Sequence, residues 1–251
     1  MDEFLDGLDN HIERSTRRWL ELGYYIGLSN ICAVVGYGNE SSPLYNVLKQ
    51  AGDSQDHFMT GSEMEPSVAQ QLADALRLAN KTHSVVLQRV GDLNILPYLH
   101  VTLAFIYHLT YYPEAMAYVA PEFPWKLTAL MLNSLMDSIE SHSRIESIRF
   151  PEHDKGKGGD RLPRPLPEDY AMRGLLWVDK YFPDGWFSND KIDDDEKYFE
   201  VASMREERRE RVLYLGCRIA ARGDGKWLEY DSTTHRFNTH LQELLKTYVI
   251  V

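Results

Sequence analysis

The sequence has 251 residues, of which 43% are hydrophobic and 12% aromatic, a composition that predicts a globular protein with a substantial core. Its formal net charge of -11 argues against strong non-specific binding to nucleic-acid backbones, although a local basic patch is compatible with it. Only two cysteines, Cys32 and Cys217, are present, so a disulfide-stapled secreted scaffold is excluded and buried free thiols are expected.

The N-terminus is acidic and amphipathic, so we expect neither a signal peptide nor a transit peptide. The longest apolar stretch, residues 95–109, is too short and too polar for a membrane span. The chain is therefore predicted to be soluble and intracellular, in the nucleus, the cytoplasm or both, with no membrane partner.

The N-terminal third is predicted to be helical. Residues 2–35 read as one continuous helix, because apolar residues recur at every third or fourth position. A Ser-Pro pair marks the start of a short helix over residues 42–50. A polar loop is expected over residues 51–66, and a further helix then extends to about residue 90.

The middle of the chain contains the most apolar helix. Residues 95–111 are apolar almost all round, which predicts a helix at the centre of a bundle that ends at Pro113. A Pro-Trp start predicts the next helix over residues 124–142. The stretch of about 151–166 is rich in Gly, Pro and charge, and is predicted to be an exposed loop.

The C-terminal part is predicted to be more irregular. A short helix over residues 168–176, a well-marked helix over 203–222, an extended piece over 227–230 and a last helix over 237–248 are expected. The predicted fold is all-α, with stacked antiparallel helical hairpins and a loop-rich C-terminal part, in a single domain over residues 1–251.

No pattern predicts catalysis, a metal or a cofactor. The acid run at residues 193–196 is consecutive and lacks the glycine of an EF-hand loop, so it is interpreted as solvated. His100 and His108 lie eight residues apart on the central helix, and are more simply core residues with hydrogen-bonding neighbours than ligands. The protein is therefore predicted not to be an enzyme.

The helix over residues 203–222 carries a run of arginines interleaved with Glu206, Glu207 and Glu210. One interpretation is a solvent face on which the opposite charges pair along the helix. The other is an RNA or DNA contact strip with aromatic residues nearby for stacking. The candidate nucleic-acid-binding residues are Arg205, Arg208, Arg209, Arg218, Arg222 and Lys226.

The block PEDYAMRG, which starts at Pro167, also has two interpretations. Glu168, Asp169 and Arg173 form a polar contact surface in one of them. In the other they are architectural, because a proline at the first helical position and acids in the first turn favour a helix start. That second interpretation, which we favour, lets Arg173 pair back to Asp169.

Three blocks together resemble a known family. They are NILPYLHVTLAFIYHL with PWKLTALMLNSL (residues 94–109 and 124–135), LPEDYAMRGLLWVDKYFPDGWF (166–187) and ERRERVLYLGCRIAARGDGKWLEYD (207–231). They resemble the DNA/RNA-binding domain of the telomerase-associated Ever-Shorter-Telomeres protein and of the Smg proteins of nonsense-mediated mRNA decay, in a version like those of filamentous fungi. The resemblance covers roughly residues 85–231.

The resemblance implies a non-catalytic, all-helical adaptor that binds telomerase RNA, single-stranded telomeric DNA or protein components of telomerase or mRNA-decay complexes. The family's tetratricopeptide domain is largely missing and its C-terminal nuclease domain is absent, so the chain looks like a fragment, a short gene product or a diverged paralogue. The alternative is a helical scaffold that binds proteins alone, which the acidic net charge and the many aromatic residues favour.

Overall fold

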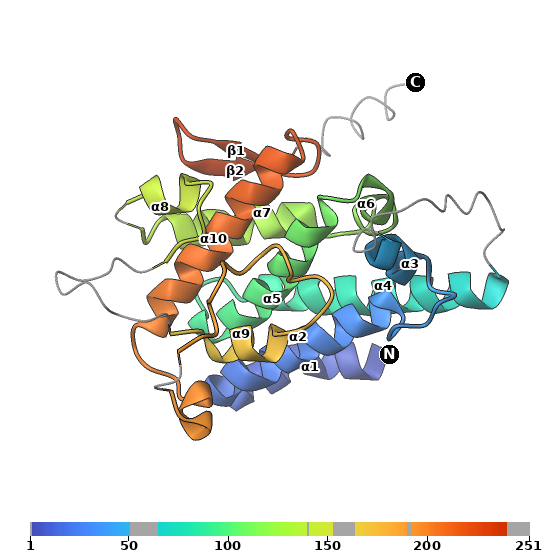
Figure 1. Cartoon of the computed structure of the whole chain (residues 1–251), viewed down its shortest axis with the longest axis horizontal. Helices are drawn as coiled ribbons and strands as arrows, with labels where there is room; N and C mark the ends of the chain where they lie inside the picture. The colour runs from blue at the N-terminus through green and yellow to red at the C-terminus, as the bar shows by residue number, and fades with distance from the viewer. Residues whose placement is uncertain (1, 51–64, 140, 153–163, 190–191, 240–251) are drawn as a thin grey trace.

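The computed structural model describes residues 2–50, 65–139, 141–152, 164–189 and 192–239. These residues are mostly helical, with one two-stranded antiparallel sheet (Figure 1), so the predicted all-α class with an irregular C-terminal part is confirmed. In chain order the elements are α1 (Asp2–Ser15), η1 (Thr16–Arg18), α2 (Trp19–Val35), α3 (Pro43–Gln50), α4 (Pro66–Leu87), η2 (Leu93–Ile95), α5 (Leu96–Leu109), α6 (Pro113–Val119), α7 (Trp125–Met136), α8 (Ser143–Glu146), α9 (Pro167–Met172), η3 (Asp194–Tyr198), α10 (Met204–Arg222), β1 (Glu229–Asp231) and β2 (Arg236–Asn238).

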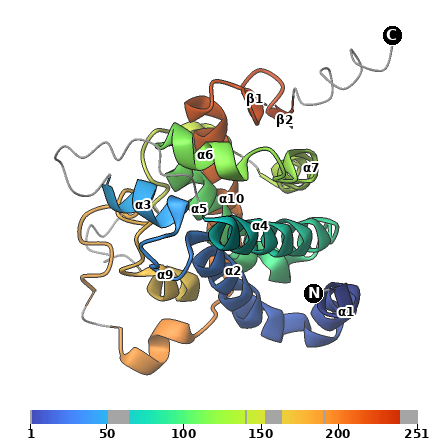
Figure 2. The same ribbon diagram turned by 90° about the vertical axis from the view of Figure 1, so that its right-hand side faces the viewer.

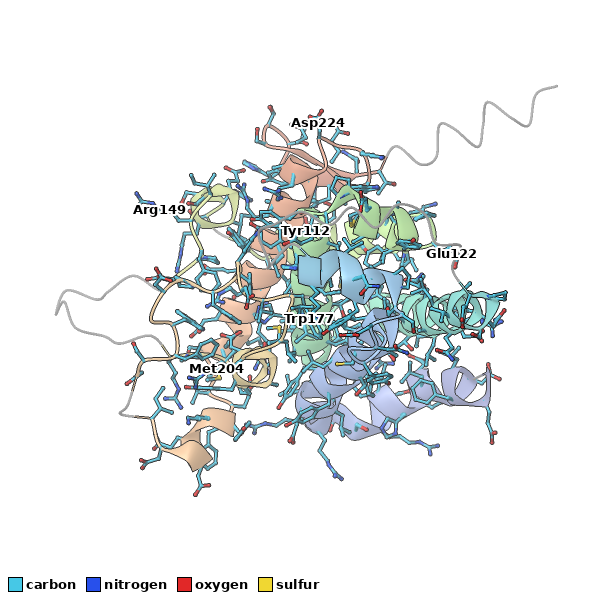
Figure 3. The ribbon with its side chains drawn as sticks, turned by 45° about the vertical axis from the view of Figure 1, so that its right-hand side comes forward. Tyr112, Glu122, Arg149, Trp177, Met204 and Asp224 are labelled. Atoms are coloured by element: carbon cyan, nitrogen blue, oxygen red, sulfur yellow. The ribbon has the colours of Figure 1, made fainter. Side chains whose placement is uncertain are left out.

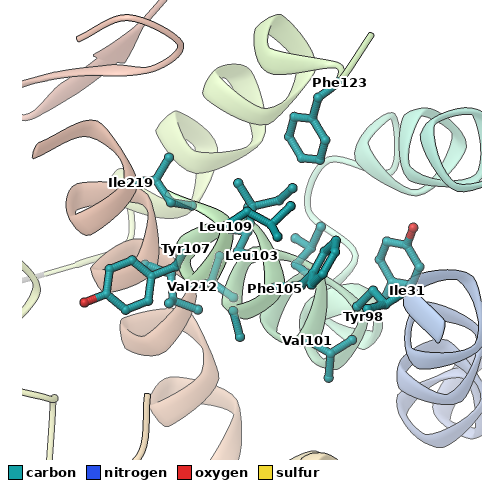
Figure 4. Close-up of a cluster of buried hydrophobic side chains, with 14 of the residues drawn as sticks. Ile31, Tyr98, Val101, Leu103, Phe105, Tyr107, Leu109, Phe123, Val212 and Ile219 are labelled. Atoms are coloured by element: carbon teal, nitrogen blue, oxygen red, sulfur yellow. The ribbon is translucent and has the colours of Figure 1, made fainter. Parts of the chain in front are cut away.

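Helix α5 is the centre of the fold, as its all-round apolar surface predicts. All of its 14 residues are buried. Its most extensive contacts are with α2 on one side and α10 on the other. Figure 4 shows Tyr98 of α5 on the α2 side and Tyr107 on the α10 side, beside Val212. The buried hydrophobic side chains form one cluster that extends from Leu8 to Phe237.

A glycine allows α2 and α5 to approach closely. A Cβ atom added at Gly27 would lie 2.7 Å from Cγ2 of Val101, which is closer than real side chains come. The small-residue contact therefore sets the spacing between these two helices.

We expect Gly27→Ala to destabilise the fold by about 1–3 kcal/mol, because overpacking forces a backbone or rotamer shift. Gly7→Ala in α1 is the matched control, since nothing lies within 4 Å of an added Cβ there. Alanine has the higher helix propensity, so the control is expected to be neutral or to stabilise by up to about 1 kcal/mol. Urea unfolding followed by circular dichroism measures both, and equal effects would contradict the close approach.

The prediction of one continuous helix over residues 2–35 is wrong, because the chain bends at Thr16. Thr16 has a φ of 46°, a left-handed conformation that starts the short η1 turn. Serine and threonine side chains compete with the helical hydrogen bonds of the backbone, so the Ser-Thr pair is a position at which a helix is easily interrupted. The bend lets α1 pack against α4 (Figure 2), with Leu8 and Ile12 buried.

Three other boundaries differ from the prediction. Pro113 not only follows α5 but also occupies the first turn of α6, a helix that the sequence did not predict. Helix α7 ends at Met136 and not near residue 142, since Asp137 and Ser138 favour turns over helix interior. Phe237 lies in β2, where its backbone pairs with the side-chain amide of Asn133, so the predicted helix does not begin there.

The helices predicted after Pro43, Pro66, Pro124, Pro167 and Ser203 are present, but the helix after Pro167 ends at Met172 and not at residue 176. The residues of the predicted last helix from 240 onward, most of the loop over 151–166 and the loop over 51–64 lie outside the described residues. Within the described ranges, no helix is long and apolar enough to span a membrane.

Candidate functional site

Helix α9 inserts two carboxylates into the interior. Pro167 occupies the first turn of the helix, and Oδ2 of Asp169 accepts a hydrogen bond of 3.0 Å from the backbone N–H of Leu166. Glu168 and Asp169 are both 0% exposed. Such burial is very costly for two adjacent acids unless cations and hydrogen-bond donors meet them inside.

Glu168 is met by a cation and an imidazole from two other helices. Arg208 of α10 donates to both carboxylate oxygens, from Nε at 2.6 Å and from Nη2 at 2.9 Å. Nδ1 of His100, on α5, lies 3.0 Å from the same carboxylate, and its Nε2 lies 2.6 Å from the hydroxyl of Tyr181. Arg208 also forms an ion pair with Glu200, from Nη2 at 2.7 Å. One guanidinium therefore binds two carboxylates.

Asp169 is held by aromatic and cationic groups. Trp186 donates its indole N–H to Oδ2 at 3.1 Å. The guanidinium of Arg211 lies 4.0 Å from the same oxygen and stacks 3.7 Å from the ring centroid of Phe150 and 4.8 Å from that of Trp186. We name the whole set the buried ionic cluster: His100, Glu168, Asp169, Tyr181, Trp186, Glu200, Arg208 and Arg211.

Burial and the arginines have opposing effects on the pKa values of the two acids. Burial alone would raise the pKa of Glu168, but the opposing charge of Arg208 and the hydrogen bond from His100 lower that pKa to about 2. Burial raises the pKa of Asp169 more than Arg211 lowers it. Burial lowers the pKa of Arg208, but Glu168 and Glu200 more than offset this and leave it raised.

The cluster combines a carboxylate, an imidazole and a hydroxyl in series, an arrangement that serves proton transfer in enzymes. Its members are inaccessible, because the side chains of His100 and Glu168 are 0% exposed and that of Arg208 is 2% exposed. Only Glu200, with a side chain 20% exposed, reaches the surface. The arrangement joins α5, α9 and α10, and its members Glu200 and Arg208 line a hollow of about 160 Å³ together with residues of η1 and α2.

The structure decides between the two interpretations of the PEDYAMRG block. Glu168 and Asp169 are buried, so a polar contact surface made of them is wrong and the architectural interpretation is confirmed. The predicted pairing of Arg173 with Asp169 is also wrong. Arg173 is exposed and its guanidinium packs 5.3 Å from the ring centroid of Phe187, while Oδ2 of Asp169 accepts hydrogen bonds from Leu166 and Trp186.

The six candidate nucleic-acid-binding residues do not form one exposed strip. Arg208 is 1% exposed and belongs to the buried ionic cluster, and Arg209 is 9% exposed and pairs with Glu206. Their predicted exposure is wrong, because position 208 lies on the inward face of α10 with Met204 and Leu215. Arg209 pairs along the helix with Glu206, as the alternative predicts, but it is buried and does not lie on a solvent face. Arg205 is exposed in the first turn of α10.

The other three candidates lie toward the C-terminal end of α10. Arg218 is half-buried and donates to the backbone carbonyl of Glu146 at 3.0 Å. Arg222 is exposed, and its guanidinium lies 3.4 Å from the ring centroid of Tyr111. Lys226 is exposed beside the ring of Trp227, at 5.5 Å.

Around Arg222 the structure brings together cations and tyrosines from three segments. Tyr111 and Tyr112, which follow α5, are half-buried, and Figure 3 shows Tyr112 near the centre of its view. The ammonium of Lys180 lies 5.0 Å from the ring of Tyr111 and 5.5 Å from that of Tyr112. It also lies within 3.4 Å of the Tyr112 hydroxyl. We name this the tyrosine–cation surface: Tyr111, Tyr112, Lys180, Arg218 and Arg222.

The cations of this surface are not neutralised locally. Lys180, Arg218 and Arg222 form no ion pair with a carboxylate of the described residues. Their contacts are with tyrosine rings, two hydroxyls and a backbone carbonyl. Free cations next to aromatic faces are the chemistry by which proteins hold single-stranded nucleic acid, with phosphates on the cations and bases on the rings.

In the acid run at residues 193–196, the acids whose side chains the structure describes face solvent. Asp193, Asp195 and Glu196 are exposed at the start of η3. No group of three His, Cys, Asp or Glu side chains in the described segments could hold a metal ion. Cys32 and Cys217 are free, the second buried and the first half-buried.

Comparisons with protein-family models, with curated proteins and with solved structures find no match to this chain. The resemblance to the Ever-Shorter-Telomeres and Smg family therefore rests on the three sequence blocks. Two of those blocks supply Glu168, Asp169 and the two arginines of the buried ionic cluster, so much of their pattern is explained by packing.

Proposed function

We propose that the protein is a non-catalytic helical adaptor of the kind that the resemblance implies, acting in telomerase or mRNA-decay assemblies. The side chains of His100 and Glu168 are 0% exposed, and this burial supports a structural role for the centre of the buried ionic cluster. An adaptor needs a rigid body that presents a contact surface, and the single core with its internal ion pairs provides that body.

We further propose that the adaptor contacts RNA or single-stranded DNA through the tyrosine–cation surface. The observation that carries this proposal is the stacking of Arg222 and Lys180 on Tyr111 without a carboxylate partner for either cation in the described residues. Phosphates would bind Arg218, Arg222 and Lys180, and a base would stack on Tyr112. With the overall charge of -11, such binding is confined to this surface.

The double variant Lys180→Ala/Arg222→Ala is expected to weaken binding of a single-stranded RNA or DNA oligonucleotide by about tenfold or more, because each lost phosphate contact removes a charge-assisted interaction. Fluorescence anisotropy against salt measures it. Three phosphate contacts on a single strand predict that log K falls with log salt with a slope of about -2. The slope of the double variant should be nearer zero.

The control is Arg17→Ala/Arg18→Ala, an exposed pair in η1 that removes the same charge from another part of the surface. It is expected to keep wild-type affinity and slope. Equal losses in the two double variants, or binding that does not depend on salt, would contradict a site on the tyrosine–cation surface.

The alternative, a scaffold that binds proteins alone, gives a different outcome in the same experiment. It predicts no retention of either oligonucleotide by the wild type, together with a protein partner that co-purifies after nuclease treatment. The burial of Arg208 and Arg209 lends this alternative weight, since two of the six candidate cations are unavailable to nucleic acid.

A further inference from the structure

A small crevice lies between α2, α4 and α5, on the side of α5 away from α10. Its volume is about 30 Å³, and its walls are mostly apolar. Five polar side chains nevertheless line it: Asn30 of α2, Asn80 and His83 of α4, and Tyr98 and Thr102 of α5. Each of the three helices therefore supplies at least one polar group to one point in the interior.

Thr102 and Asn30 contact the hydroxyl of Tyr98, but other polar atoms in the crevice lack a partner among the described residues. The side-chain Nδ2 atoms of Asn30 and Asn80 and both ring nitrogens of His83 are buried, and no described protein atom hydrogen-bonds to them. His83 is 1% exposed. Its ring lies 5.7 Å from that of Tyr98 and 5.0 Å from that of Phe123, so its faces are packed and its polar edge is left for hydrogen bonds.

Burial lowers the pKa of His83 to about 3, so the ring is neutral and carries one N–H donor and one acceptor nitrogen. A buried donor or acceptor without any partner is strongly unfavourable, and native interiors supply ordered water where protein partners are missing. The side chains of the crevice offer two amide N–H₂ groups, an imidazole and a hydroxyl, which are enough partners for bridging water.

The volume decides what can bind. A water molecule needs at least about 10–15 Å³ of such space, so a crevice of about 30 Å³ accepts about two waters and no larger molecule. We infer that a pair of ordered waters occupies this crevice, bridging Asn30 of α2 to Asn80 and His83 of α4. Through these hydrogen bonds the two waters link α4 to α2.

Nuclear magnetic resonance of the labelled protein tests the inference directly. We expect cross-peaks between water and the side-chain amide protons of Asn30 and Asn80, with the opposite NOE and ROE signs of water bound for longer than nanoseconds. If both amides show no such peaks in the wild type, the crevice is dry and the inference is overturned.

A pair of variants at neighbouring positions of α4 separates this site from general hydration. His83→Phe removes the two ring nitrogens and is expected to reduce the water cross-peaks of Asn80 at least twofold. Thr82→Val is the matched control: its hydroxyl is also buried and without a protein partner among the described residues, but Thr82 does not line the crevice. It should leave the peaks unchanged. Unchanged peaks in His83→Phe would overturn the assignment, and the wild-type spectrum decides even if that variant fails to fold.

Discussion

Replacement of Arg208 by alanine is expected to destabilise the fold by about 3–5 kcal/mol, because removal of one partner leaves a buried charge uncompensated. Glu168 would lose both of its hydrogen bonds from the guanidinium and keep only the contact with His100. Glu200 would lose its ion pair as well. Urea unfolding at pH 7, followed by circular dichroism, measures the change in the free energy of unfolding.

Arg205→Ala is the matched control, on the same helix and one turn earlier. Its side chain is exposed, so the expected change is within about 0.5 kcal/mol. The double variant Arg208→Met/Glu168→Gln removes both buried charges and is expected to recover a part of the lost stability, since apolar or neutral replacements of a whole buried pair are tolerated far better than half of one. Similar losses from Arg208→Ala and Arg205→Ala would show that the buried pairing contributes little.

The central helix could be predicted from local pattern alone. Residues 96–109 are apolar on every face, and no partner needs to be known to infer that such a helix is buried. Helix starts at Pro43, Pro66 and Pro167 were predictable for a similar reason, because proline at the first turn acts on its own segment. The bend at Thr16 depends on where α1 packs, which no local pattern determines.

The buried ionic cluster could not be predicted from the sequence, because Arg208 and His100 lie 40 and 68 residues from their partner Glu168 in the chain. One signal for it was present. Met204, Arg208, Arg211 and Leu215 recur at helical spacing, so the two arginines occupy positions of an inward stripe. Arginines at such positions require buried acids elsewhere, and the adjacent pair after Pro167 supplies them. The interpretation of these arginines as a surface strip considered their charge and not the face they occupy.

Only a part of the tyrosine–cation surface could be predicted from the sequence. Arg218 and Arg222 were chosen from the arginine run, and the expectation of nearby aromatic residues was general. Tyr111 and Tyr112 lie about a hundred positions earlier, and the hydrogen bond from Arg222 to Thr110 spans 112 residues. Lys180 comes from a third segment with no helical pattern. Only packing of α5 against α10 brings these groups together.

Acid is expected to weaken the fold through His83 at a higher pH than that at which Glu168 protonates. The pKa of this histidine is 6.5 in a model compound and about 3 in the folded chain, where burial disfavours the charged ring. Between these values the unfolded chain binds a proton that the folded chain does not, so stability falls as the pH falls below 6.5. A pH of 5 lies about 1.5 units below the pKa of the histidine in the unfolded chain, which corresponds to a loss of about 2 kcal/mol in the free energy of unfolding.

The variant His83→Phe removes this proton-linked loss and is expected to lose about 2 kcal/mol less than the wild type between pH 7 and pH 5. Thr82→Val, which changes a neighbouring buried polar group without a titratable ring, should keep the wild-type pH dependence. Protonation of Glu168 does not contribute to the change in stability between pH 7 and pH 5. Its pKa is lowered from 4.5 to about 2, so its contribution is complete above pH 4.5 and is lost only as the pH falls toward 2.

His108 adds a second, separable part of the same acid response. Burial and then the nearby charge of Lys180 lower its pKa from 6.5 to about 4, so it too opposes folding below pH 6.5. Some pH dependence must therefore remain in His83→Phe, and Lys180→Ala should reduce that remainder by removing one cause of the His108 shift. Urea unfolding at pH 7, 6 and 5 measures both effects. Parallel pH profiles of wild type and His83→Phe would show that the imidazole of His83 is charged in the folded protein, against the neutral ring on which the hydrated crevice depends.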